Sequence, residues 1–295
     1  MAEWVAAVEG TDAGHRAALI LALTAAFLHA LFGALQKGRV PPYAARTAID
    51  SWLVILSAPV ALFVVPWPCG GEWALLAGAM VIHFVYKVLQ AESYRRGAYT
   101  VVYPVVRGTG PLFTVAGAGL VFGETFSAVQ WGGVALLVAG LFGLSHYNLR
   151  HVTEGRDTLI PALGLAVLTG FTVALYTTWD ALGIRTTPDP FTFLAWFFFL
   201  TALDFPLVAM ARGRWRPDAA KAKLGLLGAV IAWGSFGSVM MATRLDSVGQ
   251  AAVLRETSTV FAAVIGWVWL REAVGPRRLG LMALIALGAA VVEFG

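Results

Sequence analysis

Three basic side chains lie in the middle of long apolar segments of this sequence, where a charge is costly. Lys87, Arg107 and Arg255 each fall in the middle third of a predicted membrane-spanning helix. Inserting such a residue costs about 2.5 to 3.5 kcal/mol even on the lenient scale, so we expect each to face a polar cavity or a charged partner. Guanidinium groups bind carboxylate and phosphate oxygens bidentately. Arg107 and Arg255 therefore predict a clamp for an anionic group of a ligand.

Further polar and aromatic side chains recur beside these three at helical spacing. His83, Lys87 and Gln90 are four and three residues apart, which places them on one face of a helix. Similar spacings recur in four other apolar segments, the first, fourth, sixth and ninth. We predict a polar cavity lined with aromatic residues, and its candidate substrate-binding residues are Arg107, Arg255, Lys87, His83, Tyr103, Gln90, Tyr176, Trp179 and Ser258.

Two acidic residues lie at a depth comparable with the basic ones. Asp204 and Glu256 are candidates for coupling, because a carboxylate within the membrane could carry a proton that drives transport. The alternative is structural, with Glu256 paired to Arg107 and Asp204 paired to Lys87 so that the pairs orient the helices. Both interpretations stay open at the level of the sequence.

The sequence offers little for catalysis. Its five histidines lack metal-binding spacing such as HExxH, and it contains no GxSxG nucleophile motif. Its single cysteine, Cys69, excludes a disulfide framework and a cysteine-ligated metal. We expect no cofactor, no metal and no enzyme activity.

The elements that must position these residues are membrane helices. Of the 295 residues, 59% are hydrophobic and 13% are charged, whereas a soluble domain carries about 25% charge. Helices of about 20 apolar residues are expected, because lipid cannot satisfy backbone polar groups. The sequence predicts ten spans, at residues 16–36, 45–66, 73–94, 99–121, 128–147, 159–179, 190–211, 222–243, 248–270 and 276–294.

An internal repeat divides the chain into two halves, 1–150 and 151–295. An offset of 148 residues aligns six identical pairs: Arg107 with Arg255, Thr109 with Thr257, Phe113 with Phe261, Glu124 with Glu272, Gly132 with Gly280, and Gly140 with Gly288. Each half holds five predicted spans, and an odd number inverts the second copy in the membrane. The predicted fold is therefore all-α, with ten transmembrane helices in two inverted five-helix repeats around a central cavity.

Charges in the loops indicate how this bundle is oriented. Fifteen loop lysines and arginines fall on one predicted face and three on the other, which carries both termini. By the positive-inside rule the basic face is cytoplasmic and both termini lie outside. This distribution also explains the pI of about 9.4 without nucleic acid as a partner.

Prolines and glycines predict departures from straight, evenly spaced helices. Pro104 and Pro111 are expected to interrupt and kink the fourth span and to free carbonyls beside Arg107. Small residues permit close helix approach, or alternatively a dimer seam, at Gly132, Gly133, Gly140, Gly143, Gly280 and Gly288.

This pattern resembles the drug/metabolite transporter superfamily, and within it the ten-span EamA-type transporters. The resemblance rests on the duplicated five-span plan and on the repeat endings from Gly110-Pro111-Leu112-Phe113 to Phe122-Gly123-Glu124 and from Thr259-Val260-Phe261 to Leu270-Arg271-Glu272. It implies alternating access around a cavity lined by the third, fourth, eighth and ninth spans. Its eukaryotic members place both termini in the cytoplasm, so two orientations stay open.

The resemblance and the basic residues together predict a secondary transporter of the bacterial inner membrane. Members that handle phosphates resemble this chain in placing basic side chains in the cavity, so we expect a small anionic or zwitterionic metabolite, such as an amino acid, an organic acid or a phosphorylated or phosphonate compound. The expected partners are this substrate, the lipid bilayer and a proton or counter-substrate, in a monomer or a dimer. Alternatives are an exporter of amines or of cationic or aromatic drugs and, more remotely, a membrane-embedded enzyme or channel.

Overall fold

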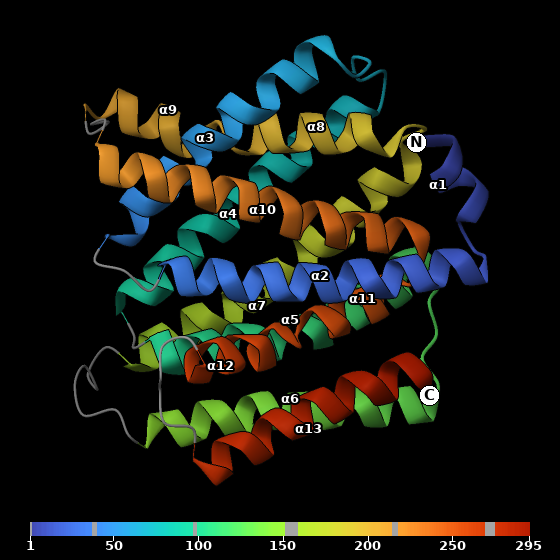
Figure 1. Cartoon of the computed structure of the whole chain (residues 1–295), viewed down its shortest axis with the longest axis vertical. Coiled ribbons are helices and arrows are strands. Elements are labelled where there is room, and N and C mark those ends of the chain that lie inside the picture. Colours follow the sequence, from blue (N-terminus) through green and yellow to red (C-terminus); the bar gives the residue numbers. More distant parts are fainter. Residues whose placement is uncertain (1, 37–39, 97–98, 151–158, 214–217, 269–274) are drawn as a thin grey trace.

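The computed structural model describes residues 2–36, 40–96, 99–150, 159–213, 218–268 and 275–295. Every regular element in these ranges is a helix. In chain order (Figure 1) they are α1 (Ala2–Val8), α2 (Asp12–Gln36), α3 (Pro42–Phe63), α4 (Glu72–Arg96), α5 (Tyr99–Phe122), α6 (Ala128–Leu149), α7 (Leu159–Thr186), α8 (Pro190–Thr201), α9 (Asp204–Ala211), α10 (Ala219–Leu245), α11 (Val248–Arg255), α12 (Ser258–Val268) and α13 (Pro276–Phe294).

Eight stretches of helix are long and apolar enough to cross a membrane, which makes the chain a multi-pass membrane protein. They correspond to the first eight predicted spans, with α8 and α9 together forming one of them. The predicted ninth span falls on α11 and α12, which are 8 and 11 residues long, so neither reaches membrane length alone. The predicted tenth span falls on α13, whose 19 residues include three charged side chains.

The helices lie side by side, and the N- and C-termini lie at the same end of the bundle (Figure 1). We call this the terminal end. Helix α10 packs against α2 and α3, whereas α7 packs against α4 and α5. Helix α13 pairs with α6, and α11 contacts both α2 and α5. The two halves of the sequence are thus interleaved, because each half packs mainly on helices of the other.

Glycines set the close approach of α6 and α13. A Cβ atom added at Gly133 would lie 2.8 Å from the Gly288 carbonyl oxygen, and one added at Gly288 would lie 2.5 Å from the Leu137 nitrogen. Gly140 and Gly143 similarly face residues of α13, so packing is their role. Gly132 and Gly280 have no atom within 4 Å of such a Cβ, which leaves them facing away from this contact.

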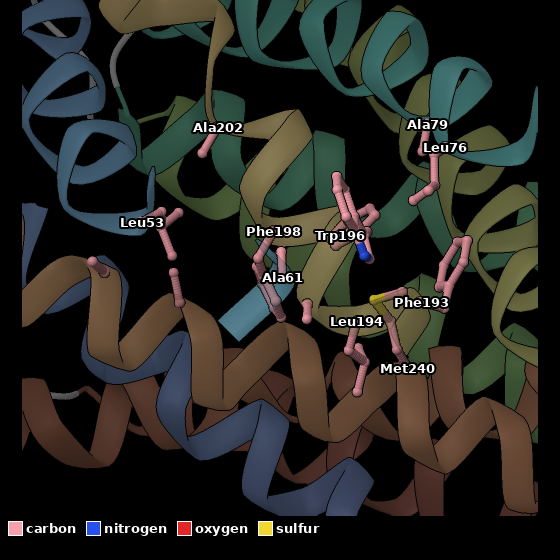
Figure 2. Packing of buried hydrophobic residues seen from close by; sticks show 14 of the residues in the cluster. Leu53, Ala61, Leu76, Ala79, Phe193, Leu194, Trp196, Phe198, Ala202 and Met240 are labelled. Atoms are coloured by element: carbon pink, nitrogen blue, oxygen red, sulfur yellow. The ribbon is translucent and has the colours of Figure 1, made fainter. Parts of the chain in front are cut away.

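The largest apolar cluster surrounds α8, whose sequence is rich in aromatic residues. Phe193 and Trp196 of α8 pack with Leu53 of α3, Leu76 of α4 and Met240 of α10, as Figure 2 shows. The Trp196 indole nitrogen also donates a hydrogen bond to the Pro66 carbonyl at 3.1 Å. This helix is buried on most of its surface and fixes α3, α4 and α10 around it.

The predicted interruption of the fourth span is wrong at the level of helix continuity. Helix α5 runs unbroken from Tyr99 to Phe122, through Pro104 and Pro111. The breaks lie elsewhere, at residues 202–203 between α8 and α9 and at residues 256–257 between α11 and α12. Neither break contains a proline. Both lie beside buried charged side chains, which can bind the backbone groups that a break exposes.

Candidate functional site

A small pocket lies between α7, α10 and α11. Its cavity volume is about 10 Å³, room for about one water molecule, and its lining comprises Tyr176, Thr177, Asp180, Ala181, Phe236, Val239, Met240, Thr243 and Arg255. All of these except Phe236 are buried. The pocket therefore combines one cationic and one anionic side chain with hydroxyl groups, aromatic rings and aliphatic surface.

Arg255 supplies the cation. It is the last residue of α11, immediately before the break, and is 4% exposed. Its guanidinium lies over the Tyr176 ring, 5.9 Å from the centroid, a distance at which the ring face attracts a cation. Within the described part of the chain Arg255 forms no salt bridge, and its Nε has no hydrogen-bond partner. A buried guanidinium in this state is available to an anionic ligand.

Arg107, which aligns with Arg255 at an offset of 148 residues, has a different environment. Its Nε lies 2.8 Å from Glu256 Oε2, and its Nη2 donates to the Arg255 carbonyl at 3.1 Å and to Ser258 Oγ at 2.6 Å. One guanidinium thereby binds a carbonyl at the end of α11, a hydroxyl at the start of α12 and the carboxylate between them. Arg107 holds the break in place from across the bundle.

Lys87 is equally engaged, at the other helix break. Its Nζ lies 3.0 Å from Asp50 Oδ2 and 2.6 Å from Asp204 Oδ1, and it donates to the Thr201 carbonyl at 2.7 Å. Thr201 ends α8 and Asp204 begins α9. Arg46 adds a second cation, 3.0 Å from Asp50 Oδ1. Both ion pairs that the sequence offered as the structural alternative, Arg107 with Glu256 and Lys87 with Asp204, are formed.

His83 contacts Asp180, an aspartate that lines the pocket. Its Nε2 lies 2.7 Å from Asp180 Oδ2, and both side chains are almost fully buried. The imidazole lies among aromatic rings, with the Tyr176 centroid at 4.6 Å and the Phe197 centroid at 5.0 Å. His83 itself does not line the pocket, but it fixes one oxygen of a carboxylate that does.

Of the nine predicted binding residues, Tyr176 and Arg255 line the pocket. Trp179 packs on Gly78 and donates to the Leu75 carbonyl at 2.8 Å, so its indole is engaged by α4. Gln90 donates to the Tyr86 hydroxyl at 2.6 Å. The Tyr103 ring lies 5.8 Å from the Arg107 guanidinium. The predicted polar faces of the helices therefore do not all line one open cavity. Several of their residues belong instead to two ion-pair networks, one around Arg107 and one around Lys87.

Two buried acidic residues, Asp180 and Asp50, were not predicted from the sequence. The predicted sixth span ended at residue 179, which placed Asp180 in a loop, whereas α7 continues to Thr186. Asp50 lies inside the second predicted span, four residues after Arg46, and that spacing is the signal that could have identified it. Thr177, Phe236 and Thr243 carried no signal, because polar and aromatic residues are common in such helices.

Two arginines close the bundle at the terminal end, next to the pocket. Arg185 Nε donates to the Thr243 carbonyl at 2.6 Å, and Arg244 Nη1 donates to the Ile184 carbonyl at 2.8 Å. Arg185 of α7 thus caps the C-terminus of α10, and Arg244 of α10 caps the C-terminus of α7. The C-terminus of a helix is a favourable position for a cation. We call this pair of contacts the arginine clasp.

Glu124 joins the first half of the chain to the clasp. Its carboxylate accepts hydrogen bonds from the backbone nitrogens of Val248 at 2.8 Å and Gly249 at 3.0 Å, and from Ser247 Oγ at 2.8 Å. It also lies 3.5 Å from Arg185 Nη2. A carboxylate at the N-terminus of α11 satisfies otherwise unpaired backbone donors. These contacts join the ends of α7 and α10 and the start of α11 to the segment after α5, next to the pocket.

Comparison with known families now bears on this arrangement. Residues 160–294 match the EamA-like transporter family. The match covers a little under half of the chain and includes α7 to α13, which contribute every residue that lines the pocket. The second half of the chain is thus similar to the EamA-like transporter family, and the eight apolar helices are long enough to cross a membrane.

A solved structure shows the fold across both halves. It is described as "Crystal structure of protein" and superimposes with a TM-score of 0.75 at 18% sequence identity, covering 93% of this chain and 95% of that one. Comparison with curated proteins gives no match. The two chains therefore share one fold over nearly their whole length, whereas the substrate has to be argued from the pocket.

Proposed function

We propose that this protein is a secondary transporter of the bacterial inner membrane that moves a small anionic or zwitterionic metabolite by alternating access. The observation that carries the proposal is Arg255, a buried guanidinium that lines the pocket and forms no salt bridge within the described residues. A permanent cation in such a place is costly unless a ligand or partner compensates it. An anionic group of the substrate supplies that compensation.

The proposal includes ten membrane spans. Helices α11 and α12 together cover residues 248–268, which is long enough for one span broken at its middle. Helix α13 then forms the tenth. Broken helices are tolerated at membrane depth where the freed backbone groups are bound by protein, as Arg107 does here.

The proposed inverted repeats are supported by how the helices pack. In an inverted repeat, α2 to α6 correspond in order to α7, α8–α9, α10, α11–α12 and α13. Each contact between two helices should then have a matching contact between their two counterparts. Helix α10 packs on α2 as α4 packs on α7, and α10 packs on α3 as α4 packs on α8. Helix α5 packs on α7 as α12 packs on α2. Helices α2 and α7 also start at opposite ends of the bundle (Figure 1).

Alternating access requires a barrier that opens on each side in turn. At the terminal end the arginine clasp and Glu124 form such a barrier directly beside the pocket, since Thr243 belongs to both. These are hydrogen bonds between helices, which can separate without unfolding any one of them. We propose that this conformation is closed on the terminal side.

The test is ligand binding by Arg255 variants of the purified protein. A thermal-shift screen of carboxylates, phosphates, amino acids and amines should find stabilisation by compounds that carry an anionic group, because a ligand that binds the folded state raises its stability. Arg255→Lys keeps the charge and loses the bidentate geometry, so it should weaken binding, and Arg255→Ala should raise Kd roughly ten- to hundredfold.

Saturable counterflow in liposomes, lost in Arg255→Ala, distinguishes a carrier from a channel. Each variant must first match the wild type in thermal stability and monodispersity, which removes misfolding as an explanation. Stabilisation by amines alone would overturn the anion site and favour an exporter of cationic compounds.

A further inference from the structure

The pocket contains an anionic side chain that an anion-binding role leaves unexplained. Asp180 is 3% exposed and lines the same pocket as Arg255. One carboxylate oxygen, Oδ2, interacts with His83 at 2.7 Å. The other, Oδ1, is buried without a hydrogen-bond partner among the described residues. A buried carboxylate oxygen in this state lacks a donor that a ligand could supply.

The formal charges of the pocket cancel. Among the residues that line it, Arg255 contributes +1 and Asp180 contributes −1, and the neighbouring Arg107 and Glu256 form an ion pair with each other. A ligand with a net negative charge would leave an uncompensated charge among buried side chains, which is costly. A ligand that carries one positive and one negative group matches both side chains and adds no net charge.

A ligand of this kind is larger than the cavity of this conformation, so α7, α10 and α11 must separate to admit it, and the rest of the lining then offers suitable groups. Thr177 Oγ1 is buried without a hydrogen-bond partner among the described residues and can act as donor or acceptor. Phe236, Val239 and Met240 supply apolar surface opposite these groups. Aromatic and aliphatic walls with a few fixed polar groups are typical of small-molecule sites.

We propose that Asp180 is a specificity-determining residue that binds the ammonium group of a zwitterionic substrate, while Arg255 binds its carboxylate or other anionic group. His83 positions Asp180 by holding Oδ2, which leaves Oδ1 directed at the ligand. This inference rests on the proposed anion site at Arg255 and narrows its ligand to a dipolar molecule.

Matched sets of ligands test this inference on the wild-type protein. Each set contains an amino acid, the acid that lacks its amino group and the amine that lacks its carboxyl group: leucine with 4-methylpentanoate and 3-methylbutylamine, and the corresponding sets for alanine and phenylalanine. In at least one set the amino acid should bind roughly tenfold or more tightly than either analogue, because only it satisfies both charged side chains.

Asp180→Asn tests the residue itself. Asparagine has nearly the same shape and can still interact with His83, but it carries no charge. The variant should lose the tenfold preference for the amino acid over the acid without losing binding of the acid. Glu293→Gln, which neutralises a buried carboxylate of α13 outside the pocket, should leave the preference unchanged.

The outcomes separate this inference from the proposed function. If the acid binds as tightly as the amino acid in every set that binds, Arg255 remains an anion site and the role of Asp180 is wrong. If neither inorganic phosphate nor any acid or amino acid binds, both proposals are wrong. The comparison within each set needs no variant, so it decides the question even if Asp180→Asn fails to fold.

Discussion

At the scale of single residues, the buried charges divide into those held by protein and those that face the pocket. Lys87 binds two aspartates and a backbone carbonyl, and Arg107 binds Glu256 and both sides of a helix break. Arg255 and Asp180 instead line the pocket, and the Arg255 Nε and Asp180 Oδ1 have no hydrogen-bond partner among the described residues. Two arginines that align at an offset of 148 residues therefore have different environments, and we propose that only Arg255 binds a ligand.

Lys87→Met should lower the stability of the folded protein without a specific loss of ligand affinity. Removing the lysine leaves Asp50 and Asp204 without one of their cations, and breaking a buried ion pair from one side costs about 3 to 5 kcal/mol. The double variant Lys87→Met/Asp204→Asn should recover part of this loss, because it removes one of the uncompensated carboxylates. Thermal unfolding of the purified variants measures both effects. A Lys87→Met protein of normal stability that no longer binds ligand would place Lys87 in the substrate site instead.

At the scale of helices, close packing and helix breaks depend on which surfaces meet. Helix α6 meets α13 at glycines whose added Cβ would collide with backbone atoms. Neighbouring glycines on the same helices face open space. Position relative to the partner helix, rather than residue type, decides whether a glycine is required.

Gly288→Ala and Gly280→Ala form a matched pair that tests this contact. The Cβ at residue 288 would lie 2.5 Å from the Leu137 nitrogen and 2.6 Å from the Gly133 carbonyl oxygen, so the helices must move apart. Overpacking of this kind costs about 1 to 3 kcal/mol. Gly280→Ala meets no atom within 4 Å and should leave the melting temperature nearly unchanged or slightly raised. Equal melting temperatures for the two variants would show that α6 and α13 do not pack in this way.

At the scale of the whole molecule, charge is distributed unevenly between the two ends of the bundle. The terminal end has Arg16, Arg185 and Arg244, and the latter two donate to backbone carbonyls. Of the fifteen other loop lysines and arginines, those in the described residues lie at the opposite end, near the start of α3, α10 and α13 and near the end of α4, α6 and α9. We propose on this basis that the terminal end is outside the cytoplasm.

The native Cys69 tests this orientation without a fusion partner. It is exposed in the turn between α3 and α4, two crossings after the start of α2 and therefore at the terminal end. A membrane-impermeant maleimide should label it in intact cells. In the variant Cys69→Ser/Arg212→Cys, the new thiol lies at the exposed end of α9, on the opposite side. It should react only after the membrane is permeabilised, and the reverse pattern would place both termini in the cytoplasm.

The amino-acid sequence by itself determined where the helices lie. Predicted and observed boundaries agree closely for most spans, and α8 to α9 begin and end at residues 190 and 211 as predicted. This succeeds because a membrane helix satisfies its hydrogen bonds locally and its length is set by bilayer thickness. The sequence also identified Lys87, Arg107 and Arg255 as buried, since charge within an apolar segment is visible without any structure.

Only the tertiary structure decided which charges pair with which and which remain for a ligand. Glu256 follows Arg255 in the chain but binds Arg107 of another helix, and Asp180 joins the pocket because α7 extends past the predicted boundary. The unbroken α5 and the break after Arg255 likewise depend on neighbours that bind the exposed backbone groups. Pairing of this kind is a property of distance between helices, and helical periodicity fixes the face a residue occupies but not the helix that it meets.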